Sequence, residues 1–324
     1  MTDTSEQLIE AFDARAARRN ERREFFRTAL GATALAAAGA AAIGWEASAG
    51  AQSITDADIF NFALNLEYLE ANFYSFAVNG SAISSDSVSG TGTYGAATGG
   101  RAVSFTDPVV QAYAREIAQD ELNHVAFLRA ALGSSAVAQP AIDLSTSATG
   151  AFSKAAQAAG IVAAGASFDP YASDENFLLG AYIFEDVGVT AYKGAAPLIS
   201  NVAYLQAAAG ILAVEAYHAA TVRGTLFSKG ISTPSLRTNA DKISDARDSL
   251  DGSTDLDQGI SPVTPTDGTG VRSNIVPADQ NGLVYSRSTG QVLNIVYLTD
   301  AAVAKGGFFP NGLNGTINTS MNNA

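Results

Sequence analysis

The chain has 324 residues, a formal net charge of −13 and no cysteine. Without cysteine, disulfides, zinc ribbons, iron–sulfur clusters and thiol catalysis are excluded, and the acidic charge argues against nucleic acid or an anionic membrane as the main partner. Because 47% of the residues are hydrophobic, the chain can bury a substantial core and is not disordered throughout. Only two histidines are present, so their positions are informative.

Residues 1–51 have the pattern of an export signal. An uncharged, alanine-rich run over 28–44 follows the basic segment Arg22-Arg23-Glu24-Phe25-Phe26-Arg27 and is too short for a convincing membrane span. A small-x-small pattern, Ala49-Gly50-Ala51, comes next. The pattern resembles a twin-arginine signal, with an ordinary secretory signal or an uncleaved anchor as alternatives. We expect a mature chain that begins near Gln52, lies in the periplasm or outside the cell, and is free of the membrane after cleavage.

The first pair of predicted helices spans residues 55–133. One helix is capped by Thr55 or Asp56 and ends near Val78. A polar, glycine-rich loop over 79–101 is expected to contain no regular element. The second helix begins at the Asp-Pro pair of residues 107–108 and ends at a glycine, residue 133.

The second pair of helices follows a long connection over 134–172, in which the alanine-rich stretch 151–164 can form a short helix. One helix is capped by Ser173 and continues without a break until it stops before Pro197. The other spans about 200–229 and ends at a glycine. Two antiparallel pairs joined by one long crossover predict an all-α four-helix bundle.

The composition changes at residue 231. Residues 231–324 are rich in Ser, Thr, Asn, Asp, Gly and Pro, and they contain neither Glu nor His. We expect a mostly irregular C-terminal extension that the apolar run 292–298 anchors to the bundle. The Asp-rich stretch 241–257 lacks the glycine and the closing glutamate of a calcium loop, so solvent is its expected partner.

Both histidines lie three residues after a glutamate, in Glu121-Leu122-Asn123-His124 and in Glu215-Ala216-Tyr217-His218. This spacing places the carboxylate and the imidazole on one face of a helix. A single Glu-x-x-His is a weak signal, but only 12 residues are glutamate and the two motifs use every histidine of the chain. In diiron and dimanganese carboxylate proteins, two helices each supply Glu-x-x-His and two others each supply a glutamate.

The other two helices offer the remaining carboxylates. Glu185 lies in an apolar stretch, where a charge is costly unless it is paired or binds a metal. The first helix offers both Glu67 and Glu70. Tyr74 follows Glu67 by seven residues, just as Tyr192 follows Glu185, so Glu67 is the first choice. Glu70 is then an alternative ligand or an outer partner of the site.

The predicted metal ligands are therefore Glu67, Glu70, Glu121, His124, Glu185, Glu215 and His218. Carboxylates combined with imidazoles suit iron or manganese, whereas zinc usually takes fewer ligands and calcium does not use imidazole. We predict two Fe or Mn ions, whose charge balances four carboxylates, with dioxygen or hydrogen peroxide as the substrate. Buried acid–histidine pairs without metal, or a site that has lost its function, are the alternatives.

Further side chains are candidates for the surroundings of the metals. Asp120, Asp186, Tyr74 and Tyr192 could orient the ligands. For the two aspartates the alternative is a solvated helix face, and for the two tyrosines it is core packing. The remaining glutamates of the mature chain are expected at the surface or at helix caps, namely Glu116 and Glu175.

Residues 55–230 resemble the ferritin-like superfamily, and more narrowly the exported ferritin-like proteins related to plant desiccation-related proteins. The resemblance rests on the segments 63–74 and 121–129, on Glu185 and on the second Glu-x-x-His motif; parts of the tail, 273–279 and 307–312, also fit. It implies a ferritin-like bundle that binds metal and handles stress or oxidants. The long loop of the first pair and the 94-residue tail would obstruct a closed cage, which argues against iron storage.

Two functions are consistent with these features. The first is an exported di-metal protein that acts as a ferroxidase or as a manganese-catalase-like oxidoreductase. The second is a structural or protective protein of the envelope, in which metal only stabilises the bundle and the tail mediates assembly or homo-oligomerisation.

Overall fold

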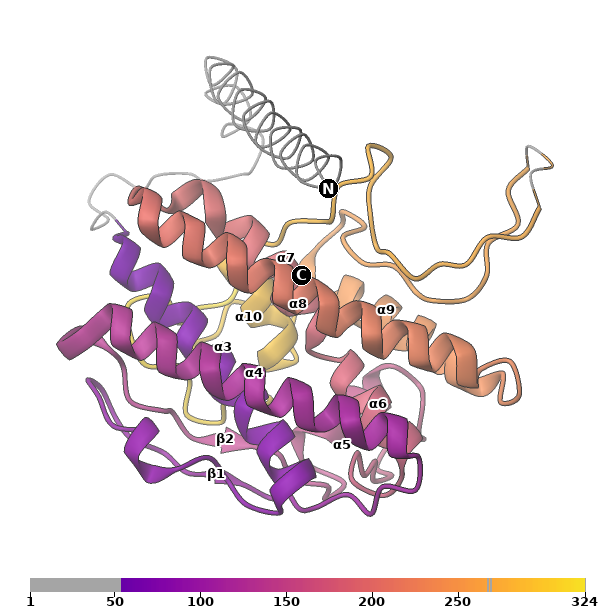
Figure 1. Cartoon of the computed structure of the whole chain (residues 1–324), viewed down its shortest axis with the longest axis horizontal. Coiled ribbons are helices and arrows are strands. Elements are labelled where there is room, and N and C mark those ends of the chain that lie inside the picture. Colours follow the sequence, from indigo (N-terminus) through magenta and orange to yellow (C-terminus); the bar gives the residue numbers. More distant parts are fainter. Residues whose placement is uncertain (1–53, 267, 269, 324) are drawn as a thin grey trace, which may run out of the picture. The chain divides into compact units, whose positions relative to one another are not determined.

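Residues 54–266, 268 and 270–323 are described by the computed structural model, and the export signal predicted over 1–51 lies outside them. The described part is mostly helical (Figure 1). None of its helices combines the length and the apolar character that a membrane span requires.

The first helix pair of the bundle consists of α3 (Asp56–Asn79) and α4 (Pro108–Leu132). Thr55 starts α3 through a capping box, and each helix ends at a glycine with positive φ. The side chain of Asn61, near the start of α3, donates to the carbonyl of Ser135, just beyond the end of α4 (3.0 Å). The two helices therefore pack antiparallel, with bounds that match the predicted ones to within two residues.

The second pair consists of α6 (Asp174–Tyr182), α7 (Glu185–Ala195) and α8 (Val202–Lys229). The prediction of one unbroken helix from Ser173 is wrong, because Ile183 and Phe184 interrupt it. At the break, backbone N–H groups bond three residues back, from Phe184 to the carbonyl of Ala181 (2.9 Å). The Phe184 ring packs against the buried aromatic rings Phe73, Phe152 and Phe308. Tertiary packing thus accompanies a break that local propensity does not predict.

The two connections touch each other through a short parallel sheet. In the loop of the first pair, β1 (Ala97–Thr98) pairs with β2 (Ile142–Asp143) of the crossover, so the expectation of no regular element over 79–101 is wrong. Of the alanine-rich stretch 151–164, only the first half is helical, as α5 (Ala151–Ala158). Three short 3-10 helices complete the connections: Ser85–Ser87, Gly133–Ser135 and Ala196–Leu198.

The C-terminal extension contains two helices and packs against the bundle. The apolar run predicted as an anchor forms α10 (Thr289–Tyr297), which packs on α7. The second helix, α9 (Ser235–Asp251), was not predicted, and it contacts α6 and α8. Phe308 of the extension is fully buried, with its ring 4.9 Å from that of Phe184. The extension therefore completes the hydrophobic core.

The prediction that the Asp-rich stretch faces solvent is wrong for two of its aspartates. Asp251 and Asp257 are buried and pair with arginines, Asp257 with Arg247 at 2.7 Å and with Arg287 at 2.8 Å. Their partners lie up to 36 residues away in the chain, so no local pattern reveals the pairing. We call the following six side chains, which are between 0 and 4% exposed, the arginine cluster: Asp186, Arg223, Arg247, Asp251, Asp257 and Arg287.

Candidate metal centre

Six buried side chains from α3, α4, α7 and α8 converge in the middle of the bundle. They form two overlapping groups of four, within each of which the ligand atoms lie within 4.8 Å of one another. Glu121 and Glu215 belong to both groups. We call the rest of the first group, Glu67 with His124, the α3 half of the centre, and the rest of the second, Glu185 with His218, the α7 half.

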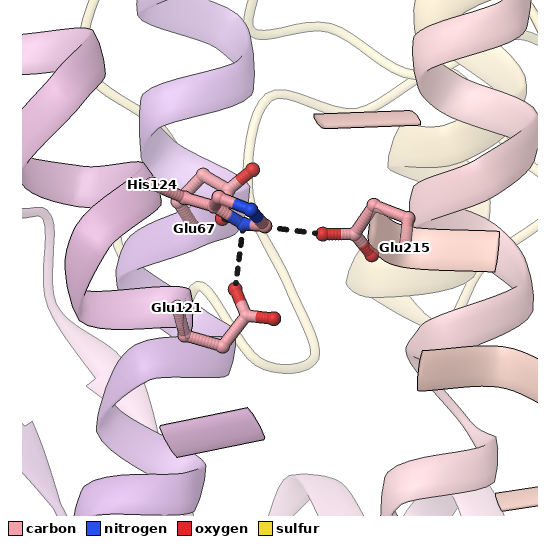
Figure 2. A group of neighbouring side chains, drawn as sticks. All are labelled: Glu67, Glu121, His124 and Glu215. Carbon is pink, nitrogen blue, oxygen red and sulfur yellow. Dashed lines mark hydrogen bonds and ion pairs between the residues drawn. The ribbon is translucent and has the colours of Figure 1, made fainter. Parts of the chain in front are cut away.

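Each histidine faces the carboxylates through its Nδ1 atom. In the α3 half, Nδ1 of His124 lies 3.2 Å from Oε2 of Glu67 and 3.5 Å from a carboxylate oxygen of each shared glutamate. Figure 2 shows His124 facing the two shared glutamates, Glu121 and Glu215. In the α7 half, Nδ1 of His218 lies 3.1 Å from Oε1 of Glu121 and 3.6 Å from Oε2 of Glu185. The two imidazole rings are 6.2 Å apart between centroids.

Most of the carboxylate oxygens that face the middle of the centre have no hydrogen-bond donor within the described part of the chain, so cations would compensate their charge. Among the residues that the structure describes, both oxygens of Glu121 and Glu215, Oε2 of Glu185 and Nδ1 of His218 are buried without a hydrogen-bond partner. Buried polar atoms are nearly always paired, and bringing four carboxylates together without compensation is costly. Two divalent ions between the two groups would satisfy these atoms. The donor set of oxygen and imidazole nitrogen fits iron or manganese.

The electrostatics of the metal-free cluster also show that negative charge is in excess. Burial and the neighbouring carboxylates raise the pKa of Glu67 to about 7 and that of Glu215 to about 8. The pKa of Glu185 is raised well above its usual value for the same reasons. Burial lowers the pKa of His218 but the surrounding carboxylates outweigh it and raise it to about 10. Without metal, protons therefore take the place of cations in the cluster.

Glu70 lies outside both groups. It is 5% exposed and lies beside Leu66, Phe184 and Gly188. Burial and the nearby carboxylates, Glu215 first among them, raise its pKa well above the usual value. The structure thus places Glu67 rather than Glu70 among the converging ligand atoms.

The two tyrosines contact ligands in a reciprocal manner. Tyr74 of α3 donates its hydroxyl proton to Oε1 of Glu185, and Tyr192 of α7 donates to Oε1 of Glu67. Both tyrosines are buried, and burial raises the pKa of each well above its usual value. The seven-residue spacing brings each tyrosine to the glutamate of the other helix because α3 and α7 run antiparallel.

The two candidate aspartates have different surroundings. Asp120 is 38% exposed and its Oδ2 lies 3.3 Å from Nε2 of His218, where it can hold the ring with Nδ1 facing the centre. Asp186 is buried and pairs with Arg223 (2.8 Å) and Arg247 (2.9 Å) of the arginine cluster. The remaining glutamates lie outside the centre: Glu116 is exposed and Glu175 pairs with Lys229.

Sequence reasoning missed one residue that shapes the centre. Gly188 of α7 faces the shared glutamate Glu215, and a Cβ atom at this position would lie 2.3 Å from Oε2 of that carboxylate. Only glycine allows the helix to approach so closely. A glycine three residues after a candidate ligand, in the interior of a helix, was the available signal.

Comparisons with known proteins agree with the resemblance drawn from the sequence. Residues 55–228 match the family model of the ferritin-like domain. The ferritin-like catalase Nec2 of Nesocodon mauritianus is 29% identical over 274 residues, which cover 81% of this chain and 84% of the relative. The desiccation-related protein PCC13-62 of Craterostigma plantagineum is 28% identical over 249 residues, which cover 74% and 76%. No solved structure matches the chain significantly.

Proposed function

This chain belongs to the ferritin-like domain family, and we propose that it is an exported protein whose bundle holds two manganese or iron ions and breaks down hydrogen peroxide. The observation that carries the proposal is the pair of four-residue groups that share Glu121 and Glu215. The similarity to a protein named a ferritin-like catalase favours peroxide over dioxygen as the substrate. A ferroxidase that uses dioxygen needs the same ligands and is the nearest alternative.

The residues of the chain have separate roles in this proposal. Glu121 and Glu215, which belong to both groups, would help to hold both ions, and each half of the centre would add one glutamate and one histidine for one ion. When bound, the two ions supply the electron exchange that converts two molecules of peroxide into two of water and one of dioxygen. The hydroxyl of Tyr74 holds the carboxylate of Glu185 in place, and the hydroxyl of Tyr192 holds that of Glu67, so that neither carboxylate rotates freely.

A cavity next to the centre fits a small substrate. It has a volume of about 240 Å³ and lies between α4 and α8, where Asp120 and His218 contribute to its lining. Hydrogen peroxide is hardly larger than water and is readily accommodated. Tyr113, Thr221 and Tyr217 add hydroxyl groups to the same lining, which suits a polar molecule.

Metal content and oxygen release from peroxide test the proposal together. Purified full-length protein, loaded with Mn²⁺ or Fe²⁺, is expected to contain close to two ions per chain by elemental analysis and to release dioxygen at an oxygen electrode. Glu121→Gln is expected to lose both properties, whereas Glu175→Gln, at a glutamate of α6 that pairs with Lys229 outside the centre and its cavity, keeps them. A chain that binds two ions but releases no dioxygen contradicts catalase activity, and a chain that binds none contradicts the centre itself.

A protective role without turnover is the second candidate, and the extension favours it. Residues 231–323 contribute buried side chains to the core, and one relative is named a desiccation-related protein. In this case the metals only stabilise the bundle, and the protein resists dehydration or assembles with other copies. Metal that raises the thermal midpoint of unfolding with no peroxide consumption would support this candidate, as would an oligomer that depends on the extension.

A further inference from the structure

The break between α6 and α7 lies directly before a metal ligand. Glu185 is the first residue of α7, whereas its counterpart Glu67 lies in the middle of the continuous helix α3. At the break the N–H of Val187 bonds to the carbonyl of Phe184 (2.8 Å), three residues back. The regular hydrogen-bonding pattern of the helix is therefore interrupted directly before Glu185, although Ile183 and Phe184 keep right-handed helical backbone angles.

Arg247 of α9 hydrogen-bonds the chain on both sides of this break. Its Nη1 atom donates to the carbonyls of Tyr182 and Ile183, the last residue of α6 and the first of the break (3.4 Å to the second). Its Nη2 atom donates to Oδ2 of Asp186, the residue after the ligand, at 2.9 Å. The guanidinium also lies over the ring of Tyr182, 4.7 Å from its centroid. One buried side chain thus bonds both sides of the break around Glu185.

The extension holds Arg247 in turn. Nη2 of Arg247 pairs with Asp257 (2.7 Å), which also accepts from Ser244 (2.7 Å) and pairs with Arg287 (2.8 Å). Arg287 donates to the hydroxyl of Thr190 in α7 (3.1 Å). Arg223 of α8 reaches the same carboxylate of Asp186 and bonds carbonyls of the extension, including those of Gly259 and Asn274. Three guanidinium groups and three carboxylates balance in charge, so the cluster is stable when buried only as a set.

We propose that Arg247 is a positioning residue for the α7 half of the metal centre, so that the C-terminal extension determines how tightly the ion beside Glu185 and His218 is bound. A planar guanidinium can bond two carbonyls and two carboxylates at once, and a lysine ammonium cannot reproduce this fork. Groups that orient metal ligands typically change metal affinity 10- to 100-fold when they are removed. The inference rests on the proposed two-metal centre but not on the reaction at it.

Half-centre variants isolate the effect. In full-length His124→Ala the ion of the α7 half is retained, and in His218→Ala that of the α3 half. Free Mn²⁺ is measured by electron paramagnetic resonance during titration of the metal-free proteins. Adding Arg247→Lys is expected to weaken Mn²⁺ binding about tenfold or more in the His124→Ala protein and to leave it unchanged in the His218→Ala protein. Arg237→Lys, a substitution on the same helix whose arginine bonds the carbonyl of Phe227, should change neither.

The outcomes separate this inference from the proposed function. A wild-type chain that takes up two Mn²⁺ ions while Arg247→Lys weakens both halves equally, or neither, overturns only the role of Arg247. A wild-type chain that takes up no Mn²⁺ overturns the two-metal centre and this inference with it. If Arg247→Lys does not fold, Ser244→Ala removes one hydrogen bond to Asp257 and is expected to weaken the α7 half alone, by a smaller factor. If Ser244→Ala changes Mn²⁺ affinity by the same factor in the His124→Ala and His218→Ala proteins, or in neither, the inference is also overturned.

Discussion

The two halves of the metal centre have the same ligands but different supports. In the α3 half, Glu67 and His124 lie within two continuous helices of 24 and 25 residues that pack along each other. In the α7 half, Glu185 begins a new helix of 11 residues, and side chains from residues 223 to 287 fix the break before it. A similar grouping of carboxylate and imidazole atoms is thus reached once by regular helix packing and once beside a buried ionic network.

The difference shows what a helix bundle can supply by itself. On a continuous helix the backbone sets the relative position of residues at i and i+3, as for Glu121 with His124 on α4 and for Glu215 with His218 on α8. A ligand at a helix break needs additional contacts, because the last carbonyls before the break are free to tilt. The extension supplies these contacts. We therefore expect the α3 half to be a property of the bundle and the α7 half to be a property of the whole described chain.

The largest expected effect is the loss of metal from both halves when a shared glutamate is replaced. Glu121 contributes to both groups, so Glu121→Gln should lose both ions, whereas His218→Ala should lose only the ion of the α7 half. Elemental analysis after dialysis in metal-free buffer measures the stoichiometry, which should fall from about two ions per chain to near zero and to about one. Glu121→Gln that retains one tightly bound ion would show that Glu121 belongs to one half only.

The next largest effect addresses the support of the α7 half. Asp257→Ala leaves Arg247 and Arg287 without their shared carboxylate in a buried site. Breaking a buried ion pair from one side costs about 3–5 kcal/mol, so the free energy of unfolding should fall by about that amount. Urea denaturation followed by circular dichroism measures it. Asp245→Asn, an exposed aspartate of α9, is the control and should change the free energy of unfolding by less than about 0.5 kcal/mol. Equal effects of the two substitutions would contradict a stabilising cluster.

The candidate ligands of both halves could be predicted from the sequence, and so could the helices that carry the α3 half. Thr55, the Asp-Pro pair before α4 and the terminal glycines mark helix ends by local chemistry. The two Glu-x-x-His motifs follow from spacing alone, and the Tyr74 spacing predicted Glu67 as the ligand of α3, the glutamate of that helix that lies in the converging groups. All these signals act within about seven residues of each other, which is the range over which helix periodicity is informative.

The support of the α7 half could not be predicted because it is non-local. The segment around Ile183 has ordinary helix-forming residues, and only contacts from Arg247 and the Phe308 ring show that the helix breaks there. The sequence of α9 is rich in Ser and Asp, which have modest helix propensity. The buried positions Leu236, Ala240 and Ile243, at spacings of four and three, were therefore not recognised as a helix face. The sequence pattern predicts that Asp251 and Asp257 are solvated, because the arginines that pair with them are not adjacent in the chain.

A third prediction concerns how the stability of the metal-free protein depends on pH. The pKa values of Glu67 (about 7) and Glu215 (about 8) in the folded, metal-free chain exceed the usual 4.5, so between these values the folded chain binds more protons than the unfolded one. Stability of the metal-free protein should therefore fall by several kcal/mol as the pH rises from about 5 to 8, because both carboxyl groups lose their protons over this range. The raised pKa of His218, about 10, acts in the same direction at higher pH, because its stabilising charge is lost as the pH rises through that value.

Metal should reverse this slope, since the ligands must lose their protons to bind it. Thermal midpoints of unfolding measured from pH 5 to 8 with a chelator and with excess Mn²⁺ test both signs. Glu67→Gln should make the chelator curve less steep between about pH 5 and 7, because Glu67 then no longer titrates while Glu215 still does. A metal-free protein that becomes more stable between pH 5 and 8 contradicts the excess of negative charge in the centre.

The smallest expected effect is the change in metal affinity when a tyrosine that bonds a glutamate of the opposite half is replaced. Tyr74 lies on α3 but donates to Glu185, and Tyr192 lies on α7 but donates to Glu67, so each tyrosine supports the ligand of the opposite half. Tyr74→Phe should therefore weaken the ion of the α7 half, and Tyr192→Phe that of the α3 half, each by about 1 kcal/mol or fivefold in affinity. Mn²⁺ titration in the half-centre variants measures each effect separately. Tyr68→Phe is the control, because this buried tyrosine of α3 bonds Arg129 and the carbonyl of Val137 instead of a ligand. It should lower the stability of the fold but leave both affinities unchanged; if each tyrosine instead acted on the ligand of its own helix, the pattern of losses would be exchanged.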